Sequence, residues 1–181
     1  ELGQKFGSLT KREIPQIECA LFVSLKRTVD GSLRGCIGTF EKGLVTKHLV
    51  EYAKSSAFED SRFLKVRSEE LKELSLSVTI LSNFTQIKDC FDWRLGEHGI
   101  RIEFYDTLKK KTSSAVFLPA VMVEQGWDHK ETISQLLRKG GYSGSLRDFN
   151  LRNISATKFH GHTEKMSYQE YCQIADDEIR I

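Results

Sequence analysis

The chain has 181 residues, of which 39% are hydrophobic and 29% are charged, and its formal net charge is only +2. This balance is typical of an ordinary globular protein, and it argues against a strongly basic surface for nucleic acid. No apolar stretch approaches the ~20 residues that a membrane-spanning helix needs.

The pattern of side chains predicts antiparallel strands and one helix in the first half of the chain. Apolar and β-branched residues predict strands over 20–26 and 33–40, and the turn at 30–31 has the Asp-Gly sequence that favours a β-hairpin. Apolar residues at helical spacing predict an amphipathic helix over 44–58. Strict alternation over 74–80 predicts a further strand with one face of small hydroxyl side chains.

The second half continues with short strands and capped helices. We expect Ser68 to cap a short helical turn, and we expect 83–93 to be irregular or briefly helical. Three further strands and three further helices are predicted, the strands at 100–105, 112–118 and 153–159 and the helices at 119–125, 129–139 and 168–178. Hairpins without regular strand–helix–strand alternation predict an α+β fold with antiparallel sheets.

The four cysteines are far apart in the sequence and form no CxxC pair: Cys19, Cys36, Cys90 and Cys172. This spacing argues against a zinc site and against a secreted disulfide framework. We therefore expect free thiols and a cytoplasmic or nuclear location, and we predict no metal site and no cofactor. His160-Gly161-His162 resembles a metal clip only superficially, because no third ligand is evident nearby.

The most distinctive segment is Leu33-Arg34-Gly35-Cys36-Ile37-Gly38. Glycine inside a strand marks a bulge or a close approach by another part of the chain. In an extended chain, side chains two residues apart lie on the same face. Regular alternation would therefore place the Arg34 cation and the Cys36 thiol side by side, with space opened by Gly35 and Gly38.

This segment resembles the signature of the AMMECR1 (AMMECR-one) family, and the chain looks closest to the eukaryotic branch of that family. Later segments resemble blocks of the family in the same order: Ser61-Arg62-Phe63, His98-Gly99-Ile100-Arg101-Ile102-Glu103-Phe104, Leu118-Pro119, Glu124-Gln125-Gly126-Trp127-Asp128-His129, Leu136-Leu137-Arg138-Lys139-Gly140-Gly141-Tyr142 and Glu164-Lys165-Met166. Several long motifs in register make the resemblance far more specific than one short pattern.

The resemblance implies one domain over 1–181, built of two unequal lobes that each carry an antiparallel sheet and helices and that meet at a cleft. Residues 1–18 match poorly, although family members carry a helix before the first strand. The family motif implies that Arg34, Gly35 and Cys36 face the cleft. No settled reaction comes with the resemblance. Prokaryotic relatives occur beside or fused to Memo-type proteins, which implies a link to such partners.

Three residues are candidates for catalysis. Cys36 would act as a nucleophile whose thiolate is favoured by Arg34, and a buried structural thiol is the alternative. His98 and His129 are the candidate bases. His98 stands in a turn beside glycine, where it could serve the turn alone. His129 stands at the start of a helix, where the dipole opposes protonation.

The predicted binding residues are Arg34, Gly35, Gly38, Asp60 and Arg62. Asp60 and Arg62 would form an ion pair at the cleft, or they would only close off the preceding helix.

Two functions from different classes follow from these residues. The first is a binding or regulatory module whose cleft receives a peptide or a partner protein, because no complete catalytic constellation is evident. The alternative is an enzyme that uses Cys36 for covalent chemistry on a small or modified substrate. Whether the protein is an enzyme stays open at this point. Binding of single-stranded nucleic acid is not expected, since it would need a basic groove with exposed aromatic side chains.

Overall fold

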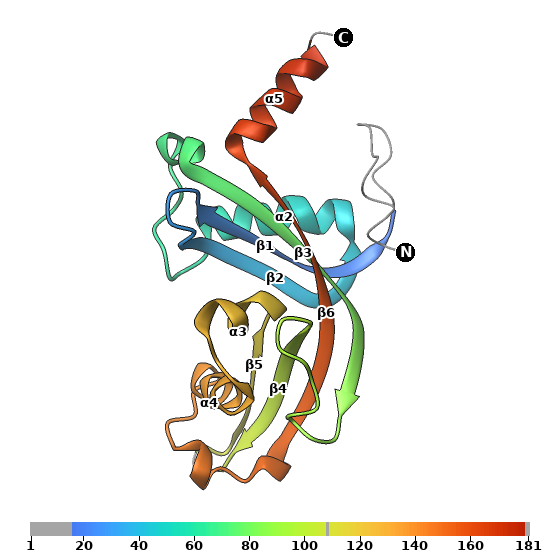
Figure 1. Ribbon diagram of the computed structural model, residues 1–181, viewed down its shortest axis with the longest axis vertical. Helices are drawn as coiled ribbons and strands as arrows, with labels where there is room; N and C mark the ends of the chain where they lie inside the picture. Colours follow the sequence, from blue (N-terminus) through green and yellow to red (C-terminus); the bar gives the residue numbers. More distant parts are fainter. Residues whose placement is uncertain (1–15, 108, 180–181) are drawn as a thin grey trace. The chain divides into compact units, whose positions relative to one another are not determined.

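The computed structural model describes residues 16–107 and 109–179, and the statements below concern this part of the chain (Figure 1). The chain divides into two compact units. Unit 1 contains the residues up to Leu81 and those from His162 onward, and unit 2 is Ser82–Gly161. The predicted N-terminal edge over 1–18, with the helix of the family, falls almost entirely outside the described residues.

Unit 1 begins with a hairpin of two strands, β1 (Glu18–Arg27) and β2 (Leu33–Leu44). Gly31 in the turn has a φ of 71°, which explains the Asp-Gly sequence there. β3 (Leu74–Ile87) pairs antiparallel with the other side of β1. The predicted strands and the predicted turn are therefore confirmed.

A helix covers one face of these strands. α2 (Val45–Phe58) packs on a buried cluster that includes Leu21 and Val23 of β1 (Figure 1). The short 3₁₀ helix η1 (Ser68–Glu73) precedes β3. The prediction that Ser68 caps this turn was wrong: its hydroxyl donates to the neighbouring Glu69 carboxylate instead.

Unit 2 holds the strands β4 (His98–Asp106) and β5 (Lys111–Phe117), together with the helices α3 (Pro119–Gln125) and α4 (His129–Lys139). All four were expected. Its core is formed by fully buried apolar side chains, including Ile100, Ile102, Phe104, Met122, Ile133 and Leu136. α3 ends at Gly126 in the left-handed region, with a φ of 67°, as its sequence predicted.

The last strand and helix complete unit 1. β6 (Ile154–Ser167) runs on from unit 2, and α5 (Tyr168–Ile179) follows it. Ser167 and Glu170 form the predicted capping box: the Ser167 hydroxyl accepts from Glu170 N at 3.2 Å, and the Glu170 carboxylate accepts from Ser167 N at 2.7 Å.

β3 and β6 are each longer than predicted, since the expected strands were 74–80 and 153–159. Residues 83–86 of β3 are all exposed, and Asn83 has a positive φ of 54°. Without a buried face these residues show no apolar alternation, so the sequence signal for a strand disappears where the strand continues. His160-Gly161-His162 consequently lies within β6 and not in a loop.

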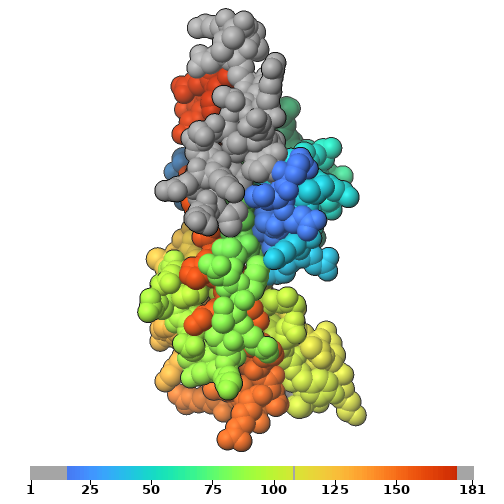
Figure 2. Space-filling view, turned by 90° about the vertical axis from the view of Figure 1, so that its right-hand side faces the viewer, coloured from blue at the N-terminus to red at the C-terminus, as the bar shows by residue number. Residues whose placement is uncertain are grey.

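The hydrogen-bonded strand order is β2-β1-β3-β6-β4-β5. β3 and β6 lie side by side in it, as Figure 1 and Figure 2 show. The α+β class with antiparallel strands is confirmed. The expectation of a separate sheet for each lobe was wrong. β3 and β6 are neighbours, and all six strands form one hydrogen-bonded sheet. Among the described residues, no helix is both long enough and apolar enough to cross a membrane.

Candidate functional site

The signature segment lies on β2, which ends the strand order and has no further strand beyond it among the described residues. Side chains bond several backbone groups of this segment. The N–H of Cys36 donates to Asp60 Oδ2 at 2.9 Å, and the N–H of Ile37 donates to Ser56 Oγ at 2.9 Å. The carbonyl of Cys36 accepts from Arg62 Nη2 at 3.2 Å. Asp60 and Arg62 thus satisfy the two outward backbone groups of Cys36, which a neighbouring strand would otherwise bind. Ser56 Oγ also donates to the carbonyl of Val23 at 2.8 Å, and Val23 is the partner of Ile37, so this hydroxyl bridges β1 and β2.

The two glycines of the segment permit close approach by other backbone. A Cβ at Gly35 would lie 2.1 Å from the carbonyl oxygen of Ser56 at the end of α2. A Cβ at Gly38 would lie 2.3 Å from the carbonyl oxygen of Leu21 on β1. Both distances are far below van der Waals contact, so both positions require glycine for packing.

Arg34 occupies an irregular position in the pairing of β1 with β2. Leu25 pairs with Gly35 and Lys26 pairs with Leu33, so Arg34 has no Cα partner and forms a β-bulge. A bulge re-aims the side chain of the extra residue. Regular alternation, on which the pairing of Arg34 with the thiol was predicted, is interrupted here.

The Arg34 guanidinium binds the segment that leads into η1. It donates to both carboxylate oxygens of Glu70, at 2.8 and 3.1 Å, and to the carbonyls of Leu64 at 2.7 Å and Lys65 at 3.3 Å. Arg34 is only 6% exposed. Its hydrogen bonds, followed by the N–H of Arg67, lower the pKa of Glu70 to about 2. The buried guanidinium of Arg34 thus binds residues 64–70 to β2.

The cation beside Cys36 is Arg62. Its guanidinium binds the buried carboxylate of Asp60 at 2.6 and 2.9 Å, while more than half of the Arg62 side chain is exposed. The pKa of Arg62 is raised first by Asp60 and more weakly by the Cys36 sulfur. Hydrogen bonds from Arg62 in turn lower the pKa of Asp60 to about 2. The predicted ion pair of Asp60 and Arg62 therefore exists, and it lies at the edge of β2.

The thiol itself is half-buried and accepts a hydrogen bond from Ser24 Oγ at 3.2 Å. Ser24 is the partner of Cys36 across β1 and β2, so both side chains lie on the same face. The Ser24 hydroxyl binds the sulfur and the half-exposed Arg62 guanidinium binds the carbonyl of the same residue, so a cation is available here for an anionic group of a ligand.

Both candidate histidines belong to unit 2, whereas Cys36 belongs to unit 1. His98 Nδ1 accepts from the N–H of Arg94 at 3.1 Å, and burial lowers the pKa of His98. His129 Nε2 bonds the carbonyl of Trp93 at 2.9 Å, and the two rings lie 4.4 Å apart between centroids. His129 therefore joins the start of α4 to the loop before β4. Catalytic roles for Cys36, His98 and His129 stay predictions.

Sequence reasoning missed three residues that hold the segment in place: Ser24, Ser56 and Glu70. The sequence held a signal for Ser56, because this small polar residue stands beside the apolar stripe of α2. In the structure Ser56 is fully buried, and its hydroxyl donates to the carbonyl of Val23. Ser24 and Glu70 carried no such signal, because their roles depend on strand register and on a contact 36 residues away along the chain.

A second candidate site in unit 1 is an apolar groove of about 410 Å³. Its walls come from α2, η1, β1, β3, the end of β6 and the start of α5, and the lining residues are Leu25, Ala53, Ala57, Phe58, Val66, Leu71, Leu74, Leu76, Met166, Ser167, Tyr168 and Tyr171. Four of the large lining side chains are well exposed: Phe58 50%, Leu71 42%, Met166 40% and Tyr171 57%. No sequence pattern predicts this groove, because its walls come from distant parts of the chain.

A sequence model of the AMMECR1 family matches residues 3–163. The chain is 38% identical over 154 residues to an uncharacterised protein of Arabidopsis thaliana, covering 83% of this chain and 72% of that protein. It is 37% identical over 151 residues to an uncharacterised protein of Saccharomyces cerevisiae, covering 77% of this chain and 60% of that protein.

The fold is also found among solved structures. The crystal structure of an uncharacterised protein from Pyrococcus horikoshii matches with a TM-score of 0.70 at 24% identity, covering 89% of this chain and 82% of that one. At this level of identity the match bears on the fold alone.

Proposed function

The chain belongs to the AMMECR1 family, and from this premise we propose that it is a protein- or peptide-binding regulatory module that uses the apolar groove of unit 1. The observation that carries the proposal is the gathering of Phe58, Leu71, Met166 and Tyr171, each 40% exposed or more, around one concave surface. Large contiguous apolar patches on a protein surface mark sites of interaction.

The lining indicates what the occupant presents. Apart from Ser167 and two tyrosines, the twelve residues that line the groove are entirely apolar, so a partner gains affinity there by burying apolar side chains. The volume of about 410 Å³ falls within the range of roughly 300–1,000 Å³ that is usual for ligand pockets. A short segment with two or three large apolar anchors, on a helix face or an extended strand, fits this surface.

The predicted binding residues have a place in this proposal. Of these residues, Arg62 is more than half exposed and can contact an acidic group of a partner, whereas Arg34 and Asp60 are buried and maintain the shape of the edge. The meeting of two lobes at a cleft stays a prediction, and the proposal does not depend on it, because residues of unit 1 alone line the groove. The proposal includes a Memo-type protein as a partner and a cytoplasmic or nuclear location.

Peptide selection tests the groove directly. We expect a displayed random peptide library to yield sequences rich in Trp, Phe, Leu or Tyr, because such anchors dominate apolar recognition. Leu71→Glu and Tyr171→Glu should each weaken binding of a selected peptide at least about tenfold, or ~1.4 kcal/mol, as measured by isothermal titration calorimetry.

Val29→Glu is the matched control. Val29 is 83% exposed and lies in the turn between β1 and β2, outside the groove. This variant should bind the selected peptides as the wild type does. Failure to select any peptide, or equal binding by the wild type and both groove variants, would contradict the proposal.

A cysteine-dependent enzyme is the second candidate, and the contact of Ser24 Oγ with Cys36 Sγ at 3.2 Å beside Arg62 favours it. If Cys36 is a nucleophile, iodoacetamide at pH 6 should alkylate it at least about tenfold faster than the half-buried Cys172. Ser24→Ala and Arg62→Gln should slow that reaction, as followed by peptide mass spectrometry. Equal rates at Cys36 and Cys172 would rule the enzyme out.

A further inference from the structure

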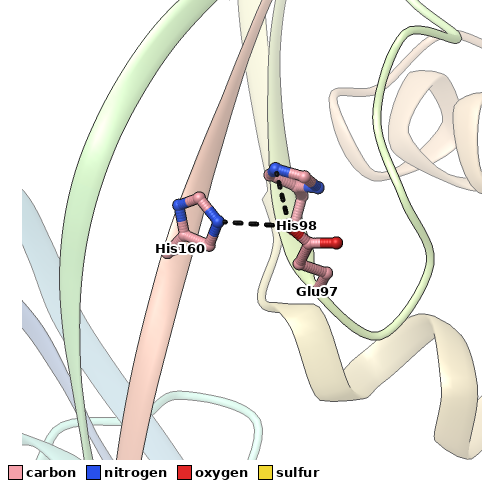
Figure 3. A group of neighbouring side chains, drawn as sticks. All are labelled: Glu97, His98 and His160. Atoms are coloured by element: carbon pink, nitrogen blue, oxygen red, sulfur yellow. Dashed lines mark ion pairs between the residues drawn. The ribbon is translucent and has the colours of Figure 1, made fainter.

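Three potential metal ligands converge in unit 2, whereas both sites described above belong to unit 1. They are Glu97 in the turn before β4, His98 at the start of β4 and His160 on β6. Figure 3 shows both imidazoles turned toward the Glu97 carboxylate. One ligand atom from each residue lies within 4.8 Å of the other two.

Strand register brings the two histidines together. His98 and His160 are direct partners in the antiparallel pairing of β4 with β6, so their side chains leave the sheet on the same face. Their ring centroids are 4.7 Å apart. His98 is only 8% exposed, and the strand ladder fixes its backbone. The separation of the two imidazoles is therefore set by the fold before any ion binds.

The carboxylate of Glu97 is also oriented. Its Oε2 accepts from Arg94 Nη1 at 3.3 Å, which leaves Oε1 facing the histidines. Oε1 lies 3.8 Å from His98 Nε2 and 3.5 Å from His160 Nε2. Both distances are at or beyond the limit of a hydrogen bond, but they are near the ~3.4 Å between two ligand atoms that each bind a tetrahedral zinc ion at about 2.1 Å.

We propose that Glu97 Oε1, His98 Nε2 and His160 Nε2 form a binding site for Zn²⁺. Two imidazoles and one carboxylate are ligands that suit this ion, and three protein ligands leave a fourth position for water or for a donor group of another molecule. The nearest basic side chain on β6, Lys158, is bound to the carbonyl and the carboxylate of Asp92, at 2.8 and 3.3 Å, so its charge is partly balanced.

Binding requires one tautomer change. In the structure, Nδ1 of His98 accepts the N–H of Arg94, so the proton of the neutral ring is on Nε2. Zn²⁺ binds Nε2 only when that nitrogen has lost its proton, and the ring then carries the proton on Nδ1. The hydrogen bond from Arg94 is given up, which lowers the affinity and marks the Arg94 amide as a reporter of binding.

The experiment is a titration of the full chain with ZnCl₂ at pH 7.5, with free zinc set by a competing chelator. We expect one ion per chain, and Glu97→Gln and His160→Ala should each weaken binding at least about tenfold. Both residues are about two-fifths exposed, so these variants should fold. His162→Ala is the matched control: His162 is the next histidine on β6, is 52% exposed, and should leave zinc affinity unchanged.

Two further readouts identify the ligands. The Arg94 amide should shift in ¹H–¹⁵N spectra of the wild type on addition of zinc, and in His160→Ala the same shift should require at least about tenfold more free zinc. Co²⁺ in place of Zn²⁺ should give the visible bands of a nitrogen and oxygen site without thiolate charge transfer. The proposal is overturned if no zinc binds, if Glu97→Gln and His160→Ala bind as the wild type does, if His162→Ala loses as much affinity, or if charge transfer shows that cysteines hold the ion.

Discussion

Replacing Gly35 with alanine is expected to lower the free energy of unfolding by about 3 kcal/mol, because the new Cβ would overlap the carbonyl oxygen of Ser56. The Cβ would lie only 2.1 Å from this oxygen, and the obstacle is backbone of α2, which has no rotamer to change. α2 would have to move away from β2 and weaken the bond from Ile37 N to Ser56 Oγ. Urea unfolding followed by circular dichroism measures the loss.

Gly31→Asn is the control for this prediction. Gly31 has open space around it, and its φ of 71° is tolerated by asparagine, so the change should cost less than about 0.5 kcal/mol. A Gly35→Ala protein as stable as the wild type would show that α2 does not approach β2 this closely.

Arg34→Met is expected to cost about 3 kcal/mol, since it removes a buried guanidinium, leaves the partly buried Glu70 with only the N–H of Arg67 as a hydrogen-bond donor, and deprives two backbone carbonyls of their donor. Arg34→Lys should recover little of this, because one ammonium lacks the planar fork that serves three acceptor groups. Urea unfolding of the single variants and of a double variant with Glu70→Leu would give the coupling energy.

Arg101→Ala supplies the comparison for a surface pair. Arg101 binds Glu103 on β4, and both side chains are at least 38% exposed, so its loss should cost no more than about 1 kcal/mol. If Arg34→Met were as mild as Arg101→Ala, the guanidinium of Arg34 would not be buried against Glu70, and a role in binding a partner would gain support.

The sequence predicted the elements of the fold well where they bury a face. Apolar side chains alternate along β1 and β4 and recur at helical spacing along α4, as the burial of one face requires. The expected ranges of these three elements were confirmed. The prediction failed where a strand loses its buried face, as in the second halves of β3 and β6. There the backbone hydrogen bonds to neighbouring strands keep the chain extended. The pattern of side chains does not indicate these bonds.

The site was predicted in part. The glycines of the signature segment correctly indicated a close approach, and the approaching groups are the backbone of α2 and β1. The pairing of Arg34 with Cys36 assumed regular alternation, and the bulge at Arg34 broke it. Contacts between residues distant in sequence, such as Arg34 with Glu70 and His98 with His160, depend on register and loop path, which a single sequence does not specify.

The way in which side chains close the outer edge of β2 has a consequence for the solution behaviour of the protein. An open edge is a template on which a second molecule can add its own strand, and chains that associate in this way form aggregates. Asp60 and Arg62 occupy the amide and the carbonyl of Cys36, which such a strand would need. Besides any part in recognition, Asp60 and Arg62 therefore act as a barrier against self-association of newly made or concentrated protein.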